Sequence, residues 1–177
     1  EYDADRAFAG AMAEPGMDTV LALSFNPVEQ VEYGVLPESL FRIEPALRQR
    51  LDFQQMAGYT ANIARLQEAA AGGGIMNQLP DDDGVVRRIP LVVRYGDALY
   101  PTLSLEMARV YFFERSFSLL TGQLGPRTVV EGVRIGREAV FSKEGLADPR
   151  VSPDGGRAVS IRNSFHENTA ALTSDLS

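Results

Sequence analysis

The sequence contains no cysteine and only one histidine in 177 residues. A disulfide scaffold, a thiolate nucleophile, a cysteine-ligated zinc and a histidine-rich metal centre are therefore excluded. Long apolar runs are also missing. The longest, Thr19–Phe25 and Ile89–Val93, are far shorter than the roughly 20 residues that cross a bilayer. The sequence therefore predicts no membrane-spanning helix within these residues.

Basic residues are fewer than acidic ones, 17 against 24, which gives a formal net charge of −7. This balance argues against nucleic acid or an anionic membrane surface as a partner. The length and the composition, 45% hydrophobic and 23% charged, are those of an ordinary globular chain, so we expect a single domain over residues 1–177. No nucleotide or cofactor motif is visible, and we expect no cofactor.

The first quarter of the chain predicts a helix followed by a buried strand. Asp3 or Asp5 can cap the helix, and Glu14-Pro15-Gly16 ends it. The unbroken apolar run Thr19–Phe25 is typical of a strand buried on both faces. Since a helix that leads into such a strand is half of a βαβ unit, we expect the preceding parallel strand upstream of Glu1.

Residues Asn26 to Gly58 show little periodicity, and we interpret them as a long surface excursion with one short helix near Glu44–Arg50. Such a segment either borders a binding site or is a variable insertion, and both interpretations stay open. A convincing helix follows over Thr60–Ala71, with Thr60 as its cap and Gly72 as its stop.

The stretch Gly72–Tyr95 predicts a strand, a polar turn at Pro80–Gly84 and a second strand. Alternation along the second strand puts Arg87 on the same face as Ile89 and Val93. An arginine on an apolar face needs a partner, because an unpaired buried charge is very costly.

Two interpretations of Arg87 remain open. One is a structural Asp83–Arg87 ion pair that holds the turn. The other is a cleft that binds an anionic ligand, for which the candidate ligand-binding residues are Asn77, Asp83, Arg87 and Arg88.

Other residue clusters give no catalytic or metal site. Asp81–Asp83 are consecutive, whereas calcium loops place their acids at alternate positions, so we expect no metal. Ser160, Ser164 and His166 lie near Asp154 in the sequence but lack the Gly-x-Ser-x-Gly elbow, so we expect no hydrolase triad.

The second half predicts a buried helix followed by short antiparallel strands. The helix covers Thr102 to about Arg115, and its apolar residues form two stripes that include Leu105 and Met107. Strands are expected at 128–131, 133–135, 139–141, near Val151 and at 158–162, with a hairpin across Asp154–Arg157. The fold class is α/β, with a mostly parallel central sheet flanked by helices and an antiparallel portion from the second half.

Two stretches carry a family resemblance. Gly74 to Leu91 reads Gly-x-x-Asn-x-x-x-Asp-x-Asp-Gly-Val-Val-Arg-Arg-x-Pro-Leu, and Tyr100 to Glu106 reads Tyr-Pro-x-Leu-Ser-Leu-Glu. Together they resemble the signature of the second CHASE family, the extracytoplasmic sensory domains of transmembrane nucleotide cyclases, histidine kinases and serine/threonine kinases.

The resemblance implies a non-catalytic input domain of a bacterial inner-membrane receptor, with an unknown extracytoplasmic signal and a homodimer formed through the full receptor. The membrane would be reached only through flanking helices. The chain opens on Glu1 without a signal peptide, and we expect a fragment that lacks the first strand and helix of the family. The alternative is a free-standing periplasmic solute-binding protein or enzyme, which the full gene would distinguish.

Overall fold

The computed structural model describes residues 3–51, 53–77, 89–136 and 139–142. The predicted turn at Pro80–Gly84, the hairpin across Asp154–Arg157 and the strands near Val151 and at 158–162 lie outside these residues. The same is true of Asp81–Asp83 and of the serines and histidine considered for a triad.

The described residues contain the four predicted helices, and all but α3 begin close to where the sequence predicts them. They are α1 (Ala4–Met12), α2 (Pro45–Arg50), α3 (Ala64–Ala69) and α4 (Leu103–Tyr111). Asp3 is confirmed as a cap, since its carboxylate accepts a 3.0 Å hydrogen bond from the Arg6 backbone N–H. The predicted Thr60 cap of α3 is wrong, because Thr60 lies in a strand and Ile63 precedes the helix.

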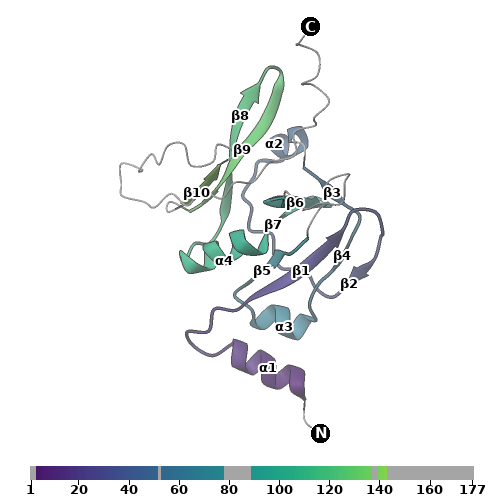
Figure 1. The fold of residues 1–177 in the computed structure, drawn as a ribbon, viewed down its shortest axis with the longest axis vertical. Helices are drawn as coiled ribbons and strands as arrows, with labels where there is room; N and C mark the ends of the chain where they lie inside the picture. Colours follow the sequence, from purple (N-terminus) through teal and green to yellow (C-terminus); the bar gives the residue numbers. More distant parts are fainter. Residues whose placement is uncertain (1–2, 52, 78–88, 137–138, 143–177) are drawn as a thin grey trace.

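The strands that the structure describes form three sheets, which confirms the mixed α/β class (Figure 1). The first has the order β2-β4-β1-β5, the second β3-β6-β7 and the third β10-β9-β8. The strands are β1 (Val20–Asn26), β2 (Glu32–Tyr33), β3 (Gln55–Met56), β4 (Gly58–Thr60), β5 (Gly72–Ile75), β6 (Val92–Tyr95), β7 (Ala98–Pro101), β8 (Phe117–Leu124), β9 (Arg127–Ile135) and β10 (Ala139–Ser142).

Pairing is mixed in the first two sheets. β1 pairs in parallel with β5, β2 with β4, and β3 with β6, while β1–β4 and β6–β7 are antiparallel. The third sheet is antiparallel throughout, as expected for this part of the chain. β1 pairs in parallel with β5 along Val20–Leu23 and antiparallel with β4 along Ser24–Asn26. The expected parallel strand upstream of Glu1 stays a prediction.

The segment from Asn26 to Gly58 is more than a surface excursion. It contains β2, α2 and β3, and it contributes Phe41, Leu51 and Met56 to the buried core. The predicted helix start at Glu44-Pro45 is confirmed. β2 and β3 span two residues each, which is too short for a periodicity to show in the sequence.

The β6–β7 hairpin lies between two hydrophobic clusters. Val92 and Leu99 belong to a cluster with Phe41, Leu105, Phe117, Val133 and Ile135. Their neighbours Val93 and Tyr100 point to the opposite side, into a cluster with Leu23, Phe25, Met56 and Ile75. Figure 1 shows the hairpin between β1–β4 on one side and β8–β9 on the other. Because side chains alternate along a strand, one hairpin joins the two halves of the core.

The three glycines before this hairpin form a strand, not only a helix stop. They are residues Gly72–Gly74 of β5, and α4 packs directly against them. A methyl group on Gly74 would lie 2.5 Å from Leu103 Cα, and one on Gly72 would overlap the Glu106 carboxylate. Glycine is needed here because helix and strand backbones approach closely.

The prediction for helix α4 was right for one stripe and wrong for the other. Leu105 is fully buried, as expected, but Met107 is 55% exposed and Tyr111 is 75% exposed. The inward face carries Glu106 and Arg109 instead. Pairing these two charges allows polar side chains to occupy a face that hydrophobicity alone would have assigned to the solvent.

We predict that Leu105→Ala lowers the free energy of unfolding by about 2–5 kcal/mol, because it leaves a cavity in the core. Met107→Ala should change it by about 0.5 kcal/mol or less, since this side chain already contacts water. Denaturant unfolding of both variants checks the pair. Equal losses would show that the orientation of α4 is wrong.

A second prediction compares two glycines. Gly74→Ala should destabilise the protein by about 1–3 kcal/mol, because the methyl group pushes α4 away from β5. Gly10→Ala should stabilise it by about 0.5–1 kcal/mol, since Gly10 lies inside α1 with open space around it. Melting temperatures that move in the same direction for both variants would contradict the close contact.

Candidate functional site

Asn77 is the one predicted site residue that lies in the described part of the chain. Its amide nitrogen donates to the Phe25 carbonyl, and its amide oxygen accepts from the Phe25 N–H, both at 2.6 Å. The pair continues the β5–β1 ladder beyond the 3.0 Å bond from Met76 N–H to the Leu23 carbonyl. Asn77 therefore fixes the end of β1.

Asp83, Arg87 and Arg88 lie outside the described residues, and so does the alternative Asp83–Arg87 ion pair. The anion site at these residues and Asn77 stays a prediction. What the structure adds is a backbone partner for the Asn77 amide, which gives this residue a structural role next to β1.

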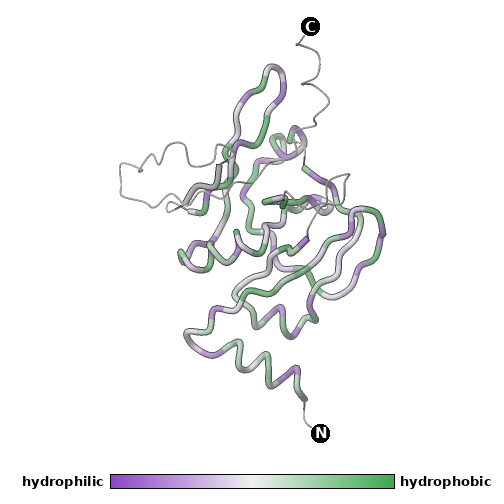
Figure 2. The backbone as a smooth tube through the Cα atoms, in the orientation of Figure 1, coloured by the Kyte–Doolittle hydropathy of each residue, from purple (hydrophilic) through white to green (hydrophobic). Residues whose placement is uncertain are grey.

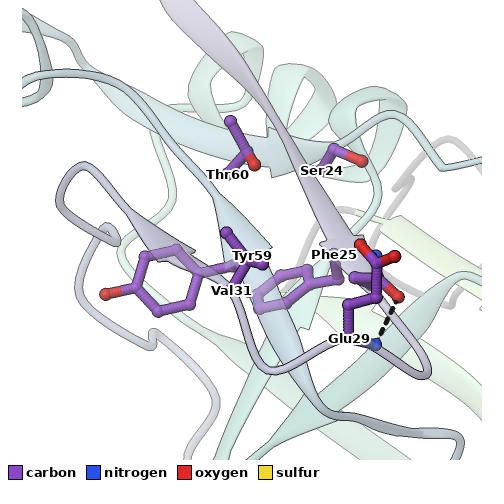
Figure 3. A pocket seen from close by; sticks show the side chains of 7 residues that line it. Ser24, Phe25, Glu29, Val31, Tyr59 and Thr60 are labelled. Carbon is purple, nitrogen blue, oxygen red and sulfur yellow. Dashed lines mark hydrogen bonds between the residues drawn. The ribbon is translucent and has the colours of Figure 1, made fainter.

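A small hollow of about 160 Å³ lies at the end of β1 that Asn77 holds (Figure 3). Its lining comes from β1, from the loop that follows β1, and from β4. The lining residues are Ser24, Phe25, Asn26, Glu29, Val31, Tyr59 and Thr60.

The loop between β1 and β2 is shaped by Asn26. Its side-chain oxygen accepts 2.9 Å hydrogen bonds from the N–H groups of Val28 and Glu29, as in an Asx turn. Its amide nitrogen donates to the Glu29 carboxylate at 3.1 Å. A single side chain therefore sets the turn and orients the acid beside it.

Gly58 of β4 lets this loop lie on the sheet. A methyl group at Gly58 would be 2.5 Å from the Val31 carbonyl oxygen and would overlap the Glu29 carbonyl oxygen. Figure 2 shows this loop, at the right-hand edge, changing between hydrophobic and hydrophilic within a few residues. Only glycine permits this contact between loop and strand.

The polar side chains that line the hollow are the Glu29 carboxylate, the Asn26 amide and the hydroxyls of Ser24, Tyr59 and Thr60. Ser24 and Thr60 are directly opposite each other in the β1–β4 pair, so their side chains are neighbours on one face of the sheet. Among the described residues, no basic side chain forms an ion pair with Glu29. Within the described ranges, the hollow therefore has the negative charge of Glu29 and no cation paired with it.

The expectation that β1 is buried on both faces is wrong, because one face of its last residues lines the hollow. Leu23 and Phe25 are 2% exposed, whereas Ser24 and Asn26 on the other face are only partly covered. The sequence signal was available, since the serine and the asparagine interrupt the apolar run at alternate positions.

Beneath the hollow lies a cluster of aromatic rings. The centroid of the Phe25 ring is 5.1 Å from that of Tyr100 and 5.6 Å from that of Tyr95, and the Tyr59 ring is 5.2 Å from Tyr95. These separations are typical of favourable aromatic pairs. The cluster gives the strand end that carries Ser24 and Asn26 a rigid support.

The Tyr95 hydroxyl donates a hydrogen bond to the Glu32 carboxylate, which links β6 to the edge strand β2. This hydrogen bond, together with partial burial, raises the pKa of Tyr95 to about 12. Burial also raises the pKa of Tyr100. Both phenols are therefore protonated at neutral pH.

A buried ion pair joins α4 to the segments on either side of it. Arg109 donates two hydrogen bonds to the Glu106 carboxylate, at 2.9 and 2.7 Å. It also donates to the carbonyls of Ala71, before β5, and of Glu114, before β8. One guanidinium therefore holds together the end of α4, the first sheet and the start of the third sheet.

Within the described ranges there is no group of three acids or histidines that could hold a metal ion. No helix of the described residues is long and apolar enough to cross a membrane.

We predict that Asn77→Ala lowers the free energy of unfolding by about 1–3 kcal/mol, because it leaves two backbone groups of Phe25 without a partner. Asn62→Ala is the matched control, since the Asn62 amide makes one bond to β1, 3.0 Å to the Ala22 carbonyl. Denaturant unfolding should show the larger loss for Asn77→Ala. An equal or smaller loss would contradict the pair of hydrogen bonds between Asn77 and Phe25.

We also predict that Tyr95 titrates near pH 12, and that Glu32→Gln moves its pKa toward the ordinary value of 10. Because the pKa is higher in the folded state, the stabilisation is fully present below pH 10 and is lost as pH rises through 12. Ultraviolet difference titration, with Tyr95→Phe to assign the signal, measures this. Glu38→Gln is the control, and an equal shift in it would refute the pairing.

Comparison with known protein families identifies the chain. The model of the CHASE2 domain matches residues 1–171, which is nearly the whole sequence. No curated protein and no solved structure matches the chain. CHASE2 domains are extracytoplasmic sensory domains and not catalytic ones. The signature residues include Asn77 and Glu106, whose bonds hold β1 and α4 in place. The chain belongs to the CHASE2 domain family.

Proposed function

We propose that this domain is the extracytoplasmic input module of a bacterial inner-membrane receptor, and that it regulates a cytoplasmic nucleotide cyclase or protein kinase. Membership of the CHASE2 family over residues 1–171 carries the proposal. The receptor acts as a homodimer, and the domain reaches the membrane only through helices that flank it in the full protein.

The connections between the sheets support signal transfer through the domain. A change at the first sheet reaches α4 through Gly74, which lies against the Leu103 backbone, and through Gly72, which lies against the Glu106 carboxylate. It reaches β8 through Arg109, which bonds to carbonyls on both sides of α4. Packed elements tied in this way move together, so a ligand that favours one arrangement biases the other end.

The location of the domain can be tested with reporters in the full-length protein. We expect alkaline phosphatase inserted at Gly125, in the turn between β8 and β9, to be active, and a green fluorescent protein at the same place to stay dark. Gly125 is suitable because nothing lies within 4 Å of it. The reverse pattern of signals would place the domain in the cytoplasm and refute the proposal.

The output can be tested in membranes that contain the full-length protein. Arg109→Lys keeps the charge but loses the forked contacts, so we expect it to change cyclic-nucleotide synthesis or autophosphorylation severalfold. Arg134→Lys, at an exposed position of β9, is the control. If the parent protein shows neither activity, the receptor assignment is wrong.

A further inference from the structure

The hollow beside β1 has features of a binding site that the family assignment does not explain. It is small and polar, and the hydrogen bonds of Asn26 hold the loop that lines it in a fixed shape (Figure 3). We propose that it binds a small organic cation that carries a primary ammonium group and a hydroxyl group.

Charge selects the cation. The carboxylate of Glu29 lies in the wall, and none of the other lining residues is basic. One carboxylate oxygen accepts the Asn26 amide bond at 3.1 Å, which leaves the other oxygen for a ligand. An anion would be repelled there, whereas the overall charge of −7 attracts cations to the domain.

Hydrogen-bonding capacity selects an ammonium group with a hydroxyl group. An ammonium donates three hydrogen bonds and accepts none, and the hollow offers the Glu29 carboxylate and the hydroxyls of Ser24 and Thr60. Figure 3 shows the two hydroxyl side chains side by side and Glu29 at the other end. A metal ion fits less well, because a single carboxylate lines the hollow and calcium takes six to eight oxygens.

Size limits the ligand to a few atoms. A cavity of about 150 Å³ accepts a molecule the size of benzene, and this hollow measures about 160 Å³. An amino alcohol such as ethanolamine is within this limit. With so few atoms in contact, the expected Kd is about millimolar.

The site is built before the ligand arrives. Asn26 sets the loop, Gly58 lets the loop rest on β4, and Asn77 fixes Phe25 between the lining residues Ser24 and Asn26. The loop and the strand end are therefore already ordered before binding. Because the ligand does not have to order them, the entropic cost of binding is small, which favours a small molecule. If the domain is a sensor, as proposed above, this cation is the class of ligand that it senses. The binding itself can be measured without that assumption.

The test is a titration of the 177-residue chain with ethanolamine, ethylene glycol and glycolate, followed by NMR and calorimetry. The three probes have the same length and differ in charge. We expect ethanolamine alone to give saturable shifts in the amides of residues 24–31 and 58–60. Raising the salt concentration should weaken the binding.

Variants locate the site. Glu29→Gln should lower the affinity for ethanolamine at least tenfold. Ser24→Ala should lower it severalfold, and this variant is the test to use if Glu29→Gln does not fold. Glu14→Gln, which removes an exposed acid after α1, should leave it unchanged. The absence of saturable binding, equal binding of ethylene glycol, or full affinity in folded Glu29→Gln would each overturn the proposal. These results would overturn only the proposed ligand. The proposed sensory function depends instead on the topology and output of the full-length receptor.

Discussion

The structure depends on the burial of one hairpin, β6–β7, on both of its faces. Val92 and Leu99 face one hydrophobic cluster while Val93 and Tyr100 face the other. Neither half of the core can therefore form without this hairpin, because each half uses alternate residues of the same two strands. The hollow and the helix α4 lie on opposite sides of this hairpin and are positioned by it.

Two kinds of contact then bring the remaining elements to this core. Glycines let backbones meet where a side chain would separate them, at Gly74 against Leu103 and at Gly58 against Val31. Polar side chains bond to backbone groups at the ends of strands, as Asn77 does to Phe25 and Arg109 to Ala71. Both are short-range and directional, so they determine register more than they add hydrophobic stability.

The sequence predicted the elements whose signal is local. Asp3 caps α1, Pro45 opens α2, and the resemblance around Gly74–Leu91 led to the family. It failed where the pairing of polar side chains or a distant residue decides the outcome. Met107 and Leu105 carry similar hydrophobic signals, and only the buried Glu106–Arg109 pair shows which of them faces inward. Within the predicted site, the partner of Asn77 is 52 residues away and could not be read from spacing. The hollow joins residues of two strands and a loop, although the Asn26 turn was visible in the sequence.

The Arg109 junction has a consequence for how this family can change over time. Removing either member of the Glu106–Arg109 pair leaves a buried charge, a loss of about 3–5 kcal/mol, whereas replacing both together with apolar residues is often neutral. Gly72 belongs to the same unit, because any side chain there overlaps the Glu106 carboxylate. Positions 72, 106 and 109 should therefore vary as a set among related domains. A lineage that loses one of them passes through an unstable intermediate before it can reach another stable combination.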